Sequence, residues 1–258
     1  MHLARLAQWS GRLDQSRQLR LSAEDLARQA SLTTGWVIRV HTAYEEALLG
    51  EPDWALQHLR EGIERELSAL PARTHRERIR TSVVFAFVDA PETTEQMVQD
   101  SEEAIRPEWK GKTWRAETER ALLYARVVRG DSANMEEAFD RLTLESGCRD
   151  TCWLFDQAWL HDRLGQREQA IALYERVRQQ GFILRSVQAN QGEILHAMIR
   201  LGPLYDELGQ SAEAIEAYQR MVDQWADGDE RGQETVQRFR ERITALGGST
   251  QDLVGSTQ

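Results

Sequence analysis

The feature that limits the fold most is a repeated segment of helix length. It recurs along the chain and ends each time at a glycine. The run Leu164–Tyr174 recurs as Leu208–Tyr218, 44 residues later, with Leu-Gly-Gln, Ala-Ile and Tyr at the same places in both copies. Weaker copies precede them. A period of this length is typical of arrays of stacked structural units. The turn positions are Gly11, Gly50, Gly130, Gly165 and Gly209, with Asp89 between the second and third, and their spacings are 39, 39, 41, 35 and 44.

The residue types at the recurring positions suit two helices joined by a tight turn. Glycine accepts a positive φ after the first helix without steric cost. A small residue such as Ala170 allows the second helix to approach the first closely, and a large one such as Tyr174 fills the space towards the next pair. Each pair alone leaves an apolar face exposed, so the pairs are expected to stack into a continuous core.

The pattern predicts an all-α chain of about six antiparallel helix pairs, in a single domain over 1–246. The run Thr81–Val88 is β-branched and aromatic, and it fits a buried helix segment as well as a strand. A final helix over 230–246 has one apolar and one charged face, as a capping helix needs, and a polar, disordered tail is expected over 247–258. The predicted pairs are 2–10 with 14–30, 33–49 with 52–69, 72–88 with 92–106, 113–129 with 133–146, 151–164 with 167–180, and 188–208 with 211–226.

Charge and hydropathy exclude several classes of protein. The 258 residues carry a net charge of -10, whereas a nucleic-acid surface usually needs a basic stripe. No stretch approaches the roughly 20 apolar residues of a membrane helix, and no signal peptide is recognisable at the N-terminus, so a cytoplasmic location is expected. Residues 131–258 hold 13 basic and 22 acidic side chains. This surplus serves solubility, and it also favours cationic partners.

The C-terminal copies resemble the tetratricopeptide repeat family. The resemblance is strong over 151–228 and weak but periodic over 1–146. Met198 stands where the family often has tryptophan, and Ala226 where it often has proline. The resemblance implies a right-handed superhelical array, and the spacing, longer than about 34 residues, is similar to that of bacterial signalling regulators. The residues that carry it are Leu201, Gly202, Tyr205, Gly209, Ala214 and Tyr218, matched in the preceding copy by Ala158, Gly165, Ala170 and Tyr174.

The family resemblance also implies where a partner binds, because the first helix of each pair lines a concave groove. The groove positions combine aromatic, aliphatic and acidic groups, which suit an extended peptide with apolar anchors and a basic flank. Trp159 is expected to be an exception to packing between repeats, and if it faces the groove, its replacement by alanine should weaken binding with little loss of fold. Lysine and asparagine are missing, so no clamp for a C-terminal carboxylate is expected. The positions are Cys152, Phe155, Trp159, Asp162 and Arg163, and then His196, Ile199, Pro203, Asp206 and Glu207.

The sequence offers no catalytic motif, metal site or cofactor site. Gly111-Lys112-Thr113 lacks the glycine-rich loop of a phosphate-binding motif, so it is interpreted as part of an inter-helix loop. Cys148 and Cys152 are two thiols near a predicted turn, which is too few for a zinc site, although a redox disulfide is geometrically feasible. Packing as small apolar side chains is the favoured interpretation. His161 is expected in the core of its helix pair.

Three functions fit these observations. The first is a non-enzymatic scaffold that binds a protein or peptide, as a segment of a larger bacterial signalling or regulatory protein. The second is a sensor domain that holds a small ligand and controls a missing kinase or transcription-regulator effector domain. The third is an all-α hydrolase, for which the sequence offers no acid–base carboxylate pair. The scaffold is the favoured hypothesis.

Two local features give further expectations. Gly11 follows a short first helix, so the array begins abruptly and without a polar cap. The chain is therefore expected either to be cut from a longer protein or to bury this helix against something else. Pro203 lies inside a predicted helix and removes one helical hydrogen bond, which predicts a kink or a break near Leu201 and Gly202.

Overall fold

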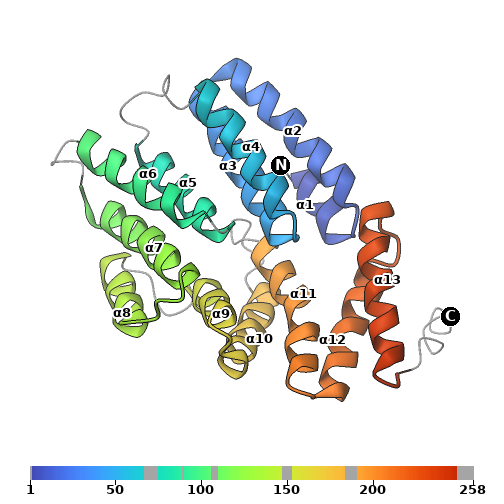
Figure 1. Cartoon of the computed structure of the whole chain (residues 1–258). Helices are drawn as coiled ribbons and strands as arrows, with labels where there is room; N and C mark the ends of the chain where they lie inside the picture. The colour runs from blue at the N-terminus through green and yellow to red at the C-terminus, as the bar shows by residue number, and fades with distance from the viewer. Residues whose placement is uncertain are drawn as a thin grey trace. The chain divides into compact units, whose positions relative to one another are not determined.

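The computed structural model describes residues 2–66, 75–88, 90–105, 110–146, 153–183 and 191–248, and these residues form helices joined by short turns, with no strand among them (Figure 1). The prediction of an all-α fold of consecutive helix pairs, as in an α-solenoid, is confirmed. The helices are α1 (His2–Trp9), α2 (Leu13–Ala30), α3 (Leu32–Leu48), α4 (Pro52–Glu66), α5 (His75–Phe87), α6 (Pro91–Ala104), α7 (Lys112–Val128), α8 (Met135–Ser146), α9 (Leu154–Arg163), α10 (Arg167–Ile183), α11 (Gln191–Glu207), α12 (Ser211–Gln224) and α13 (Glu230–Ala245).

The helices group into two compact units. One contains Leu21–Gln166 and is called the middle unit; the other contains Met1–Arg20 together with Arg167–Gln258 and is called the terminal unit. The terminal unit therefore joins the first residues of the chain to the last repeats. Each unit is described by itself.

The predicted turn glycines adopt the left-handed backbone that the pattern requires. Gly11, Gly50, Gly130, Gly165 and Gly209 have φ of 74°, 90°, 84°, 71° and 72°. At Gly209 the backbone N–H donates to Asp206 O at 2.9 Å, and the next N–H, of Gln210, donates to Tyr205 O at 2.9 Å. These bonds satisfy carbonyls that the helix end leaves without intrahelical partners. Asp89, the predicted non-glycine turn residue, lies outside the described residues.

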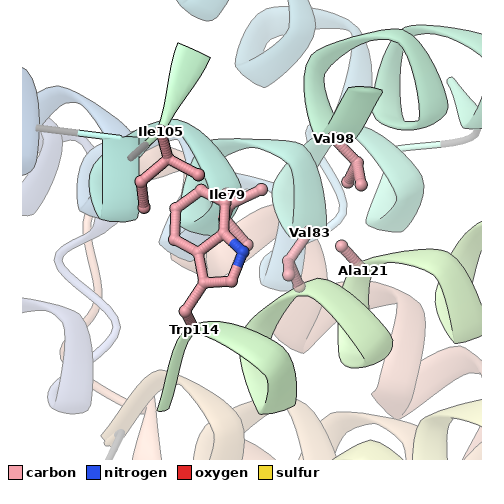
Figure 2. Close-up of a cluster of buried hydrophobic side chains, with 6 residues drawn as sticks. All are labelled: Ile79, Val83, Val98, Ile105, Trp114 and Ala121. Carbon is pink, nitrogen blue, oxygen red and sulfur yellow. The ribbon is translucent and has the colours of Figure 1, made fainter. Parts of the chain in front are cut away.

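In the middle unit α5 is covered by several neighbouring helices. It packs against α3, α6 and α7, and every residue from Thr81 to Val88 is buried. The β-branched run is therefore a buried helix segment because neighbouring helices cover it on several sides. Trp36 of α3 donates its indole N–H to Thr81 Oγ1 at 3.2 Å. Figure 2 shows the cluster between α5, α6 and α7, made of Ile79, Val83, Val98, Ile105, Trp114 and Ala121.

In the terminal unit α10 to α13 pack in succession, and α1 packs against α11. The predicted amphipathic character of the last helix is confirmed, since α13 buries Val236, Phe239 and Ile243. The first helix buries Ala4 and Ala7. This helix packs against α11, near the other end of the same chain, while its Leu3 and Leu6 stay exposed.

The helix break predicted at Pro203 is wrong. Helix α11 continues from Gln191 through Pro203 to Glu207. Proline removes one backbone donor, but Leu201 and Leu204 are buried beside it, and α10 and α12 pack along the same helix. The buried apolar area outweighs a single lost hydrogen bond. A kink without a break stays a prediction.

Candidate interaction surface

The predicted groove residues of α9 lie in the middle unit, where two are buried and two are accessible. Phe155 and Trp159 are buried, Trp159 with an exposed fraction of 5%. Asp162 is half-buried and Arg163 is exposed, with its guanidinium 5.7 Å from the centre of the Trp159 ring. Cys152, together with the predicted cluster of Cys148 and Cys152, lies outside the described residues.

Trp159 belongs to a column of aromatic rings. Its ring stacks on Phe87 of α5 with centroids 4.7 Å apart and on Tyr124 of α7 at 4.8 Å. Tyr44 of α3 meets the Phe87 ring edge-on at 5.5 Å. Four helices thus contribute one ring each to this aromatic column. The expectation that Trp159 is an exception to packing between repeats is wrong, because Phe87 and Tyr124 stack on its ring and little of its surface reaches solvent.

A buried ion pair lies next to the aromatic column. Asp156 accepts a hydrogen bond from Arg120 at 2.7 Å and another from the Tyr124 hydroxyl at 2.5 Å. Burial alone would lower the pKa of Arg120, but the Asp156 carboxylate beside it raises that pKa well above its ordinary value. The charges of Arg120 and Asp156 therefore pair with each other within the core.

A second buried ionic network, which the sequence analysis missed, joins α2, α3 and α4. Glu24 has an exposed fraction of 2% and accepts from Arg39 at 2.6 Å, from His58 at 2.9 Å and from Arg28. Burial would raise the pKa of Glu24, but hydrogen bonds and charge from His58 and Arg39 outweigh it and lower that pKa. At Gly62 a Cβ would lie 2.5 Å from Arg39 Cδ, so this position needs glycine for Arg39 to cross α4. Buried pairs of this kind fix how helices pack.

The predicted groove residues of α11 lie in the terminal unit. His196, Ile199 and Pro203 are half-buried and Glu207 is exposed. Residues spaced by three and four positions lie on one face of a helix, so these four form a continuous line, called here the α11 stripe. The stripe contains one imidazole, two apolar side chains and one carboxylate. On the same helix Leu195, Ala197, Met198, Leu201 and Leu204 are buried, whereas Ile194, Arg200 and Tyr205 are half-buried.

The two predicted carboxylates of α11 pair with arginines from neighbouring helices. Arg242 of α13 donates two hydrogen bonds to Asp206, one of them at 2.9 Å, and this guanidinium lowers the pKa of Asp206. Glu207 pairs with Arg167 of α10 at 2.5 Å. Sequence reasoning placed both carboxylates but not their partners, because a pairing across 36 or 40 residues depends on tertiary packing.

Titration of the Tyr218 hydroxyl tests the contact between Tyr218 and Asp206. Its hydroxyl donates to Asp206 at 3.4 Å, and burial, reinforced by the Asp206 charge, raises the pKa of Tyr218 from 10.0 to about 12. A raised pKa means that Tyr218 contributes stability below pH 10 that is lost as the pH rises towards 12. Burial also raises the pKa of Tyr205, so absorbance titration at alkaline pH should show late-titrating tyrosine in the native chain and less of it in Tyr218→Phe. Equal late titration in both chains would contradict the assignment.

Among the described residues no group of histidine, cysteine or carboxylate side chains is arranged to hold a metal ion. Nor do the described helices include one that is long and apolar enough to cross a membrane. In the predicted Gly111-Lys112-Thr113 loop, Gly111 is the N-cap of α7, so Lys112 and Thr113 begin that helix.

Comparison with known families bears on the repeats directly. The tetratricopeptide repeat model matches residues 154–180 and 196–228. The first segment covers α9 and most of α10, and the second covers most of α11 and all of α12. The match confirms the resemblance found in the sequence and indicates a scaffold for protein–protein interaction. No match to a curated protein or to a solved structure was found.

Proposed function

We propose that this chain, whose residues 154–228 carry tetratricopeptide repeats, is a non-enzymatic scaffold that binds an extended segment of a partner protein along the α11 stripe. The observation that supports this proposal most directly is the accessibility of one line of α11, on which His196, Ile199 and Pro203 are half-buried and Glu207 is exposed. The apolar side chains suit an aliphatic anchor of the partner, and the terminal carboxylate suits a basic residue next to it.

A partner can displace Arg167 from Glu207 at a small cost in free energy. Glu207 and Arg167 have exposed fractions of 42% and 43%, and an exposed ion pair contributes only about 0–1 kcal/mol. An arginine or lysine of the partner can therefore replace Arg167. Asp206 is less available, because its side chain is only 13% exposed and two hydrogen bonds from Arg242 hold it. In the middle unit, Asp162 and Arg163 of α9 are the accessible members of the predicted set.

A peptide selection tests the proposal. A library of random peptides selected on the full chain should yield sequences with an aliphatic residue beside arginine or lysine. Glu207→Gln and Ile199→Ala should each weaken the selected peptides about five-fold, because each removes roughly 1 kcal/mol of contact. Glu213→Gln, at an exposed carboxylate on α12, is the matched control and should leave affinity unchanged.

Two results of this selection would contradict the proposed site. Peptides that bind Glu207→Gln and Ile199→Ala as tightly as the native chain would remove the α11 stripe from the proposal. Binding that falls equally in Glu213→Gln would show a general charge effect instead of a site.

The setting proposed for this scaffold is a cytoplasmic regulatory or signalling protein of a bacterium. The support is the repeat spacing of 35 to 44 residues, which is longer than the family's usual period. The basic character proposed for the partner follows from the acidic surplus of residues 131–258 and from the carboxylate at the end of the stripe.

A further inference from the structure

One side of α13 carries two exposed arginines and faces α11. Arg238 and Arg242 lie four positions apart, so their side chains leave α13 on the same side. Arg242 donates two hydrogen bonds to Asp206 of α11, one of them at 2.9 Å. Arg238 is therefore only about one helical turn, about 6 Å along the axis, from a residue that contacts α11.

The order of the helices sets which part of α11 is level with Arg238. Helix α12 packs against both α11 and α13 and is joined to each by a short connection, so α11 and α13 run in the same direction (Figure 1). One turn before Arg242 on α13 is then level with one turn before Asp206 on α11. Pro203, a member of the α11 stripe, stands at that level.

Helix α13 is held at both ends, which fixes the position of Arg238. The carboxylate of Asp229 caps the start of α13, and it also accepts from Asp14 N at 2.7 Å and from Gln15 N at 3.2 Å at the start of α2. This junction joins the first turn of the chain to α13. Towards the other end, Arg242 ties α13 to α11. A charge on an anchored helix costs a ligand little ordering of the protein.

Arg238 has no carboxylate partner among the residues that the structure describes. Its guanidinium donates to the hydroxyl of Thr235 at 2.9 Å, a neutral group that leaves its charge uncompensated. The arginines that pair with the two carboxylates of α11 are, in contrast, already engaged. The planar fork of a guanidinium binds a carboxylate through two parallel hydrogen bonds. The charge and geometry of Arg238 therefore suit an incoming carboxylate.

We propose that Arg238 is a second charged subsite of the partner-binding surface and receives the side-chain carboxylate of an aspartate or glutamate in the bound segment. The proposal rests on the proposed function, because the same segment places its basic residue at Glu207 and its aliphatic residue on the α11 stripe. A segment with only basic charges would bring a like charge to Arg238 and bind less well. An extended segment advances about 3.3 Å per residue, so the acidic residue lies about two to four positions from the basic one.

Affinity of labelled peptides for the full chain tests the subsite. The peptides selected from the random library should carry aspartate or glutamate about two to four positions from their basic residue. Replacement of that residue by its amide should weaken binding about three- to five-fold, and Arg238→Gln should do the same. Arg238→Glu should weaken binding roughly tenfold, and lysine in place of the peptide's acidic residue should recover most of that loss.

Arg176→Glu is the matched control, because it makes the same change of charge at an exposed arginine of α10 in the same unit. It should change affinity less than about two-fold, since exposed charges at a distance are screened by salt. An equal loss in Arg176→Glu, or a loss in Arg238→Glu that the lysine peptide does not recover, overturns the subsite. Dependence on the peptide's terminal carboxylate, and not on its acidic side chain, overturns it as well.

The proposed function can stand when the subsite fails. Selected peptides that lack an acidic residue, or unchanged affinity in Arg238→Glu, overturn the subsite alone, provided that Glu207→Gln and Ile199→Ala still weaken binding. A selection that yields no peptide, or only peptides whose affinity neither of those two variants changes, overturns the proposed function and the subsite together.

Discussion

Trp159→Ala is expected to lower the free energy of unfolding by about 3–5 kcal/mol, the usual cost of removing a large buried aromatic side chain. Trp159 is buried, and its ring separates Phe87 from Tyr124 in the aromatic column. Its removal leaves a cavity that rings from two other helices border, and stacking energy is lost on both faces. Urea unfolding of the full chain, followed by circular dichroism, measures the loss.

Two further substitutions show how much of the loss of stability in Trp159→Ala comes from the missing ring. Trp159→Phe retains a ring in the column and should cost about 1–2 kcal/mol. Arg163→Gln removes the exposed cation over the indole and should cost at most about 1 kcal/mol. A loss below about 1 kcal/mol for Trp159→Ala, combined with weaker peptide binding, would contradict the packing role and restore Trp159 as a groove anchor.

Gly11→Ala should destabilise the chain by about 2–5 kcal/mol, through two independent effects. Gly11 has φ of 74°, where an L-residue pays about 1–2 kcal/mol. Its new methyl group would also lie 2.8 Å from the Trp225 side chain, and overpacking of this kind typically costs about 1–3 kcal/mol. Trp225 is fully buried, so it has little room to shift.

Gly209→Ala separates the two effects in the same unit. Its φ of 72° is close to that of Gly11, but no atom lies within 4 Å of an added Cβ. This variant should therefore show the backbone cost alone, about 1–2 kcal/mol. Equal losses in the two variants would mean that Trp225 accommodates the methyl group, and the close packing of the chain's first turn on α12 would not be needed for stability.

The helix pairs could be predicted because their signals are local. A glycine at the turn, a small residue such as Ala170 and an aromatic residue such as Tyr174 act within one hairpin, so the sequence around them is sufficient. Each helix begins and ends within three residues of its expected bounds. For example, α2 begins at Leu13 instead of 14, and α7 ends at Val128 instead of 129. The prediction of a helix break at Pro203 was wrong, because the sequence around Pro203 does not show that α10 and α12 both pack against this helix.

The candidate surface was harder to predict, because its accessibility depends on other helices. The family pattern places Trp159, Asp206 and Glu207 at groove positions, but it does not say what covers them. Rings from α5 and α7 cover Trp159, and an arginine holds each carboxylate. A usable signal did exist for the column: Tyr44, Phe87, Tyr124 and Trp159 follow one another at 43, 37 and 35 residues, close to the repeat period.

The junction between the first turn and Asp229 has a consequence for synthesis on the ribosome. Asp14 and Asp229 are separated by 215 positions, and translation adds about 5–20 residues per second. The first hairpin must therefore wait about 10–40 s for its partner to emerge, while the intervening repeats already have their neighbours. Closure of the terminal unit is a late, long-range step, and the N-terminal end of α2 in the nascent chain lacks the Asp229 carboxylate until the last repeats emerge.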